Sequence, residues 1–176
     1  MLIIPTKAKK LKSLAYREPT KQRTHSIFKI FAQEQSKISA NRCHAAIYYG
    51  VKRNTGNLDI LIEPTKENGA KLIDALKENE LEIPEIKPEE FEQKLVLAFG
   101  LEPDAVDILN YTPGLDFETT FRNSIEVDFS GLKVRMIDIR DLITNKEHLN
   151  REGEKSYLDK YDVEVLKKIL QKRNTE

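Results

Sequence analysis

The sequence contains no tryptophan, one cysteine and three histidines among its 176 residues. A single cysteine excludes an internal disulfide framework and is typical of proteins in the reducing cytoplasm. The histidines, at positions 25, 44 and 148, form no zinc-binding pattern with Cys43. Neighbouring side chains on a helix point in different directions, so we interpret Cys43 and His44 as packing residues and not as a nucleophile with its base.

Long apolar stretches are also missing. No run of eighteen apolar residues occurs, so no membrane span is expected. The apolar start Met1–Ile4 is too short for the core of a signal peptide, and Pro5 follows it directly. No internal repeat or low-complexity tract is present. The length fits one domain with a real core, and we expect a soluble cytoplasmic protein.

The net charge is zero, but the two signs are separated along the chain. Residues 1–53 contain 12 lysines or arginines and two acids, a net charge of +10, so the remaining residues carry −10. We expect residues 1–25 to form a flexible basic arm ahead of a domain that spans residues 26–176. The arm could bind nucleic acid phosphates, remain a solvated tail or dock on the acidic part of the same chain. No interleaved aromatic residues or recognised reading motif accompany the charge.

Hydrophobic periodicity and turn residues predict an α+β fold, in which helices cover a mixed β-sheet in a single domain. Helices are expected over residues 26–35, 41–49, 64–79, 116–121, 138–146 and 158–172. Strands are expected over residues 57–63, 91–99, 104–109, 125–129 and 132–136, with a loop at 80–90. The last two strands form a hairpin with the two-residue turn Ser130-Gly131. Between the first two helices, only residues 37–39 could form a strand.

The stretch Arg53–Glu63 joins a polar turn to a buried strand. Asn57 and Asp59 are two residues apart, so their side chains share one face of that strand. Two neighbouring oxygen ligands suit a hard divalent cation. The same pattern also fits a turn with an Asx cap and one surface aspartate.

A second carboxylate adds to this pattern. Asp107 lies on the short strand predicted at residues 104–109, on the face opposite Val106 and Ile108. If the two strands are neighbours, Asp107 joins Asn57 and Asp59 in one site that holds one or two metal ions. Such sites support phosphoryl transfer, because the cation holds the attacking and leaving oxygens.

An ordered set of motifs between residues 45 and 170 resembles the small bacterial nucleotidyltransferase-like proteins of the DNA polymerase beta-like superfamily. The motifs are Gly50-x-x-Arg53-x-Thr55-Gly56-Asn57-Leu58-Asp59-Ile60, Glu63–Asn68, Val106–Leu109, Gly114–Phe117, Gly131–Val134, Asp141-Leu142-Ile143-x-Asn145-Lys146 and Asp159-x-x-Asp162-Val163-Glu164.

The resemblance implies a nucleotidyltransferase-like fold and a metal-dependent reaction. A nucleotidyl group would pass from a nucleoside triphosphate to an acceptor hydroxyl on a small molecule, RNA or protein, with Mg²⁺ or Mn²⁺ as cofactor. Asp59 and Asp107 would be the catalytic metal ligands, and Asn57 a neutral third ligand. Asp107 would also position or deprotonate the acceptor hydroxyl.

The resemblance further implies that Lys52, Arg53, Thr55 and Lys146 contact the triphosphate. The residues themselves leave other roles open. Lys52 and Arg53 could belong to a solvated turn, and Thr55 could cap that turn. Lys146, with Lys155 and Asp162, could lie on a solvated helix face.

Two features depart from the family pattern. The family usually has Asp-x-Asp where this chain has Asn57-Leu58-Asp59, and a Gly-Gly pair where it has Arg42 and Cys43. Glycines there let backbone amides approach a triphosphate, and side chains obstruct that approach. The loss of the first aspartate and of the Gly-Gly pair therefore supports an alternative, a catalytically inactive binding or interaction module. Many proteins of the family are linked to toxin–antitoxin or phage-defence systems, so the resemblance also implies that setting as an alternative. The break in resemblance before residue 44 fits either true divergence or an error in the coding sequence.

Overall fold

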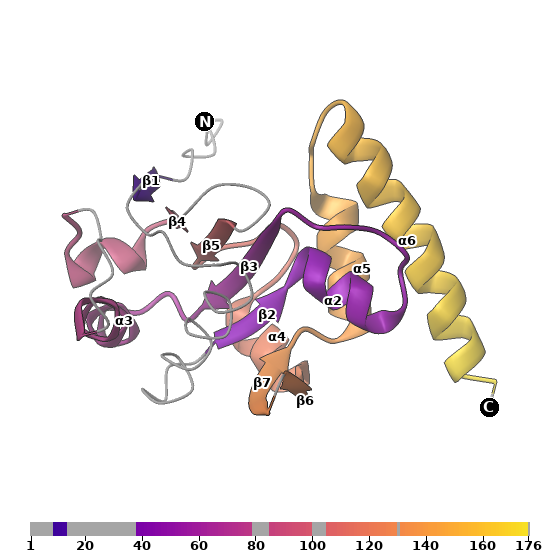
Figure 1. The fold of residues 1–176 in the computed structure, drawn as a ribbon, viewed down its shortest axis with the longest axis horizontal. Coiled ribbons are helices and arrows are strands. Elements are labelled where there is room, and N and C mark those ends of the chain that lie inside the picture. Colours follow the sequence, from indigo (N-terminus) through magenta and orange to yellow (C-terminus); the bar gives the residue numbers. More distant parts are fainter. Residues whose placement is uncertain (1–8, 14–37, 79–84, 100–104, 130, 176) are drawn as a thin grey trace, which may run out of the picture.

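The computed structural model describes residues 9–13, 38–78, 85–99, 105–129 and 131–175, and these form one α+β domain (Figure 1). The strands are β1 (Lys9–Ser13), β2 (Ile38–Asn41), β3 (Asn57–Ile62), β4 (Leu95–Phe99), β5 (Ala105–Leu109), β6 (Ile125–Phe129) and β7 (Leu132–Met136). The helices are α2 (Arg42–Tyr49), α3 (Lys66–Glu78), the 3₁₀ helix η1 (Pro88–Glu92), α4 (Phe117–Asn123), α5 (Ile139–His148) and α6 (Glu154–Arg173).

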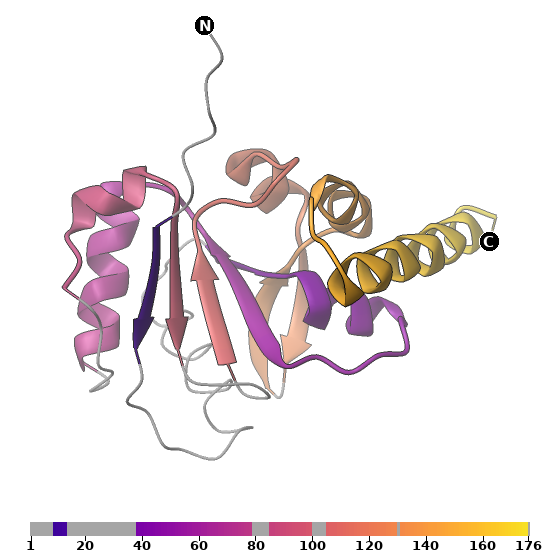
Figure 2. The same cartoon turned by 90° about the horizontal axis from the view of Figure 1, so that it is seen from above.

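The described strands form one mixed sheet in the order β1-β4-β5-β3-β2-β7-β6. β3 runs parallel to β5 and antiparallel to β2, which in turn runs parallel to β7. Helices α3 and η1 lie at the β1–β4 end of the sheet, whereas α2, α5 and α6 lie at the other end (Figures 1 and 2). The described helices include none that is long and apolar enough to cross a membrane.

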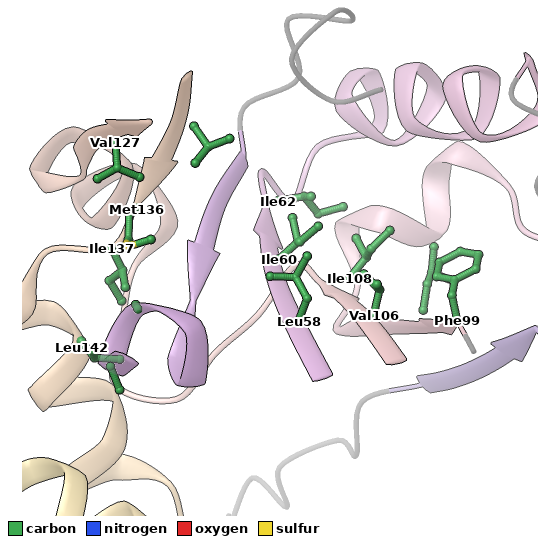
Figure 3. Close-up of a cluster of buried hydrophobic side chains, with 14 of the residues drawn as sticks. Leu58, Ile60, Ile62, Phe99, Val106, Ile108, Val127, Met136, Ile137 and Leu142 are labelled. Carbon is green, nitrogen blue, oxygen red and sulfur yellow. The ribbon is translucent and has the colours of Figure 1, made fainter. Parts of the chain in front are cut away.

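The main core lies on one face of the central strands. Leu58, Ile60 and Ile62 alternate along β3 and pack with Val106 and Ile108 of β5 (Figure 3). A smaller cluster of Leu61, Leu109 and Phe117 covers the opposite face. β3 is therefore buried on both faces after its first residue. The face that carries Asn57 and Asp59 becomes apolar at the next side chain, Leu61.

Most predicted elements are present, with shifted boundaries. The predicted strand at 91–99 is wrong in its first half, because Pro88–Glu92 forms η1 and the strand begins only at Leu95. Pro88 at the first helical positions favours that turn, and it directs Phe91 into the core. Asp116 and Asp138 lie just outside α4 and α5 as their N-caps, where each carboxylate accepts a backbone N–H. α6 begins four residues before the predicted position.

The basic arm differs in part from its prediction. Lys9–Ser13 forms the edge strand β1, which pairs in parallel with β4, Lys9 opposite Leu95 through Ser13 opposite Phe99. Main-chain pairing with the open edge of β4 accounts for the formation of this strand, since the segment itself has few apolar residues. Residues 1–8 and 14–25 of the arm, and the helix predicted at 26–35, lie outside the described residues.

Helix α3 packs on η1 through a glycine. A Cβ atom on Gly69 would lie 2.5 Å from Cγ and Cδ2 of the Phe91 ring, and Phe91 is fully buried. Only a residue without a side chain permits this close approach.

We expect Gly69→Ala to lower the free energy of unfolding by about 1–2 kcal/mol, because the strain of overpacking exceeds the gain in helix propensity. Urea denaturation followed by circular dichroism measures this loss. The same substitution in a Phe91→Leu background is the control, and there the loss should shrink because the smaller side chain leaves room for the methyl group. A Gly69→Ala variant that is as stable as the wild type would contradict the tight contact.

Candidate functional site

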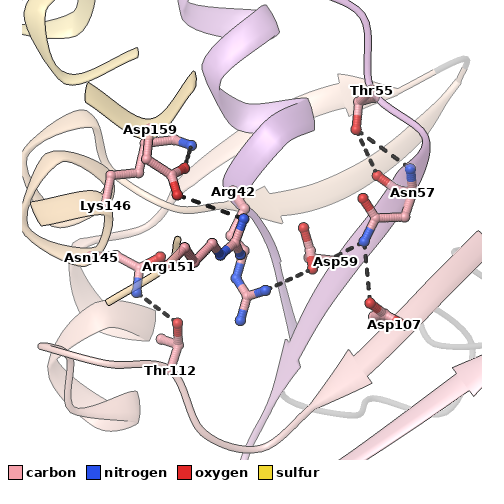
Figure 4. A network of polar contacts seen from close by, with 10 residues as sticks. All are labelled: Arg42, Thr55, Asn57, Asp59, Asp107, Thr112, Asn145, Lys146, Arg151 and Asp159. Carbon is pink, nitrogen blue, oxygen red and sulfur yellow. Dashed lines mark hydrogen bonds and ion pairs between the residues drawn. The ribbon is translucent and has the colours of Figure 1, made fainter. Parts of the chain in front are cut away.

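The polar side chains of β3 and β5 lie beside one another on one face of the sheet. β3 and β5 are parallel neighbours, and Asp59 is the register partner of Asp107. The predicted juxtaposition of these carboxylates on adjacent strands is confirmed. Asn57 joins them, since its Nδ2 lies 3.2 Å from Oδ2 of Asp107 and 3.5 Å from Oδ1 of Asp59 (Figure 4). The amide thus donates between two carboxylates and offsets part of their mutual repulsion.

Arg42 is the second partner of Asp59. Its Nη1 atom lies 3.2 Å from Oδ1 of Asp59, whose side chain is 2% exposed (Figure 4). Burial raises the pKa of the Asp59 carboxyl, the Arg42 guanidinium opposes that rise, and the Asp107 carboxylate adds to it. The guanidinium therefore compensates a buried negative charge.

Arg42 has an unusual backbone conformation at the junction of β2 and α2. Its φ angle is 55°, in the left-handed region that favours glycine, and no other non-glycine residue among the described ones has a positive φ. A glycine would adopt this conformation without a steric penalty. The chain instead tolerates strain at Arg42 and gains a cation beside Asp59.

This conformation predicts an inverted order of stability for two substitutions. Arg42→Gly and Arg42→Ala both remove the ion pair, but only glycine relieves the backbone strain. We expect the glycine variant to be more stable than the alanine variant by about 1–2 kcal/mol. The matched control is Lys71, exposed within α3. There the alanine variant should be more stable by about 1 kcal/mol. Urea denaturation of the four variants measures both differences, and the same order at the two positions would contradict the strain.

A buried ion cluster ties α5 to α6 beside this site. Nζ of Lys146 lies 3.0 Å from Oδ1 of Asp159 and 2.7 Å from Oδ2 of Asp162. Arg53, from the turn before β3, bonds the same Oδ2 of Asp162 at 2.6 Å. Arg151 approaches Asp159 at 3.6 Å. The solvated face considered for Lys146 and Asp162 is wrong, because both residues are buried.

A cavity of about 500 Å³ opens between the carboxylates of the sheet and the start of α6. Four cationic side chains and three carboxylates line it together with polar and small residues. The lining residues are Arg42, Cys43, Arg53, Thr55, Gly56, Asn57, Asp59, Asp107, Arg151, Lys155, Leu158 and Asp159. Four cations around paired carboxylates suit an anionic ligand that also carries a metal ion.

The cavity brings together most of the residues proposed from the sequence. Arg53 and Thr55 line it with the three metal-ligand candidates, and Oγ1 of Thr55 also donates to the carbonyl of Asn57 at 3.0 Å. Lys52 is exposed and Lys146 is enclosed by its two carboxylates, and neither lines the cavity. The predicted contact of Lys146 with a triphosphate is therefore not supported by its position.

Sequence analysis missed part of the lining. Arg151 belongs to the loop between α5 and α6, where no motif marks it. Asp159 stood within a motif, but its spacing did not show that it faces the cavity. Arg42 was identified only as an obstruction, whereas the structure makes it the ion-pair partner of Asp59.

A second cavity, of about 290 Å³, lies further along β3 near Leu61 and Phe117. Leu115 and Tyr111 add to its apolar lining, and the described residues that line it include no lysine or arginine. The lining of this cavity therefore offers a phosphate-bearing ligand no cation, unlike the lining of the first.

The donor set can hold a divalent cation only with help from a ligand. No group of three or more His, Cys, Asp or Glu side chains suited to a metal occurs in the parts of the chain that the structure describes. Asp59 and Asp107 supply two carboxylates, and Asn57 an amide. Mg²⁺ is commonly held by one or two carboxylates together with substrate phosphates, so this set fits such an ion.

No protein-family model matches the sequence, and no curated protein matches it significantly. The functional argument therefore depends on the residues and geometry of the site.

Proposed function

We propose that the protein binds a nucleoside triphosphate with Mg²⁺ or Mn²⁺ in the cavity above β3 and β5, and transfers its nucleotidyl group to an acceptor hydroxyl. The observation that carries the proposal is the in-register pair Asp59 and Asp107 inside a cavity with four cationic side chains. The divalent cation would neutralise phosphate charge and orient the reacting oxygens. The family resemblance of the sequence motifs points to the same chemistry.

The residues of the chain have distinct roles in this proposal. Asp59 and Asp107 would hold the cation, and Arg53 and Lys155 would face the phosphate chain. The acceptor oxygen attacks the α-phosphorus, the bond from that phosphorus to the bridging oxygen breaks, and pyrophosphate leaves. The Asp107 carboxylate, half-buried at the cavity wall, accepts the proton of the acceptor hydroxyl.

The test is incubation of the protein with each nucleoside triphosphate and Mg²⁺ or Mn²⁺, followed by pyrophosphate detection and intact-mass measurement. Slow pyrophosphate release is expected, because Asn57 lacks the charge of an aspartate. Asp107→Asn should lose this release, whereas the control Asp74→Asn, at an exposed position of α3, should keep it. Equal release by the two variants would contradict the role of Asp107.

A second function is favoured by two specific contacts. The Asn57 amide and the Arg42 guanidinium already compensate Asp107 and Asp59. A protein that keeps the fold as a binding module, without turnover, would show this arrangement. Nucleotide binding without pyrophosphate release, in the same incubations, would identify this second function. Nucleic-acid binding through the basic arm remains a separate prediction, with salt-dependent affinity as its measurement.

A further inference from the structure

Arg42 occupies a position from which it can serve two partners. It is the first residue of α2, its side chain is 16% exposed, and it lines the cavity beside Arg53, Arg151 and Lys155. In the structure its guanidinium bonds Oδ1 of Asp59 at 3.2 Å. The same guanidinium faces the space that a phosphate chain would fill.

Arg42 and a divalent cation compete for Asp59. The carboxylate is almost completely buried, so few directions of approach to its oxygens are open. A cation that binds Oδ1 would lie within a few ångströms of the guanidinium, and like charges at that distance in a buried site repel strongly. The ion pair and metal binding therefore exclude one another at this oxygen.

A phosphate chain is the stronger partner for the guanidinium. It carries several negative charges and accepts two parallel hydrogen bonds from an arginine, whereas Asp59 receives one bond from Nη1. The strained backbone of Arg42 is also a feature that is concentrated at functional sites.

We propose that Arg42 guards the metal site: the phosphate chain of a nucleotide draws the guanidinium away from Asp59, and only then is Oδ1 of this carboxylate open to a divalent cation. This inference rests on the proposed nucleotide and metal site. It makes phosphate binding and metal binding positively coupled through one side chain.

The test uses two measurements in which Arg42→Met has opposite effects. Calorimetric titration with Mn²⁺ alone should show binding to Arg42→Met about tenfold tighter than to the wild type, because the competitor is gone. Titration with a fluorescent nucleoside triphosphate in EDTA should show binding about tenfold weaker, because a phosphate ligand is gone. A purely structural role of Arg42 would weaken both. Arg42→Lys keeps the charge and should give intermediate values, and it serves as the second variant if Arg42→Met does not fold.

Arg140→Met is the control, since the Arg140 guanidinium is exposed on the surface and lies 3.9 Å from Asp138. It should change neither affinity. Mn²⁺ binding of equal strength by the wild type and Arg42→Met would overturn the guarding role and leave the metal site standing. If neither the wild type nor Arg42→Met nor Arg42→Lys binds Mn²⁺, the proposed metal-dependent function is overturned together with the guarding role of Arg42.

Discussion

Lys146→Met is expected to lower the free energy of unfolding by about 3–5 kcal/mol, the usual cost of removing one partner from a buried ion pair. Lys146 lies between Asp159 and Asp162, and its side chain is 1% exposed. Methionine keeps most of the volume and removes the charge, so two buried carboxylates lose their shared cation. Among the described residues, Oδ1 of Asp162 has no hydrogen-bond donor, which leaves Arg53 as the remaining compensation on its other oxygen.

The chain offers a matched control on the same two helices. Nζ of Lys167 on α6 lies 2.6 Å from Oε1 of Glu147 on α5, but both side chains are about half exposed. Lys167→Met should therefore cost less than about 1 kcal/mol. Urea denaturation of both variants, followed by circular dichroism, measures the contrast. Equal losses would show that burial does not set the strength of the α5–α6 ion pairs.

Asn57→Asp is expected to change the stability of the protein in opposite directions in the absence and in the presence of a divalent cation. The amide of Asn57 donates to Asp107 and contacts Asp59, so an aspartate there places three carboxylates together. In EDTA the free energy of unfolding should fall by about 1–3 kcal/mol, since a hydrogen bond becomes a repulsion. Mn²⁺ should reverse this loss. The added charge should tighten metal binding about tenfold, or ~1.4 kcal/mol, and ligand binding to the native state stabilises it.

Thermal denaturation in EDTA and in excess Mn²⁺ measures both effects, and calorimetry gives the affinity directly. The control is Asn123→Asp, because Nδ2 of Asn123 donates to Oδ2 of Asp141 at 3.0 Å on the surface. Its modest loss should be the same in EDTA and in Mn²⁺. Equal metal affinity of wild type and Asn57→Asp would mean that position 57 is not part of a metal site.

Turnover depends on the neighbouring positions as well. Cys43→Gly should raise pyrophosphate release more in the Asn57→Asp background than alone, since residues that act as a unit are not additive. Fast pyrophosphate release by the wild type would show that turnover does not require an aspartate at position 57.

The centre of the site follows from local sequence rules. The alternation of side chains along β3 and β5 fixes which residues share a face, and Asn57, Asp59 and Asp107 are the polar ones on that face. Their apolar neighbours determine which strands are central, so the pairing of β3 with β5 agrees with the pattern. The sequence left the pairing of these two strands as a condition, which the register of Asp59 with Asp107 satisfies.

The remainder of the site depends on contacts that periodicity does not encode. Lys146 appears in the sequence as one of many helical lysines, and only the docking of α6 encloses it between two carboxylates. The conformation of Arg42 depends on the junction between β2 and α2, where the residue type gives no sign of a positive φ. Residues 9–13 form the strand β1 because they pair with the open edge of β4, which lies more than eighty residues away in the chain.

The pair Arg53–Asp162 joins residues 109 positions apart, and it has a consequence for the order of assembly. Asp159 and Asp162 belong to α6, so during synthesis the cations of the turn before β3 and of α5 lack these anionic partners until residue 162 has been added. Closing so long a loop is slow compared with forming the local hairpin β6–β7. The nascent sheet can therefore pair its strands early, but the wall of the cavity is completed last, and a chain that ends before α6 would carry Asp59 and Asp107 without the enclosure around them.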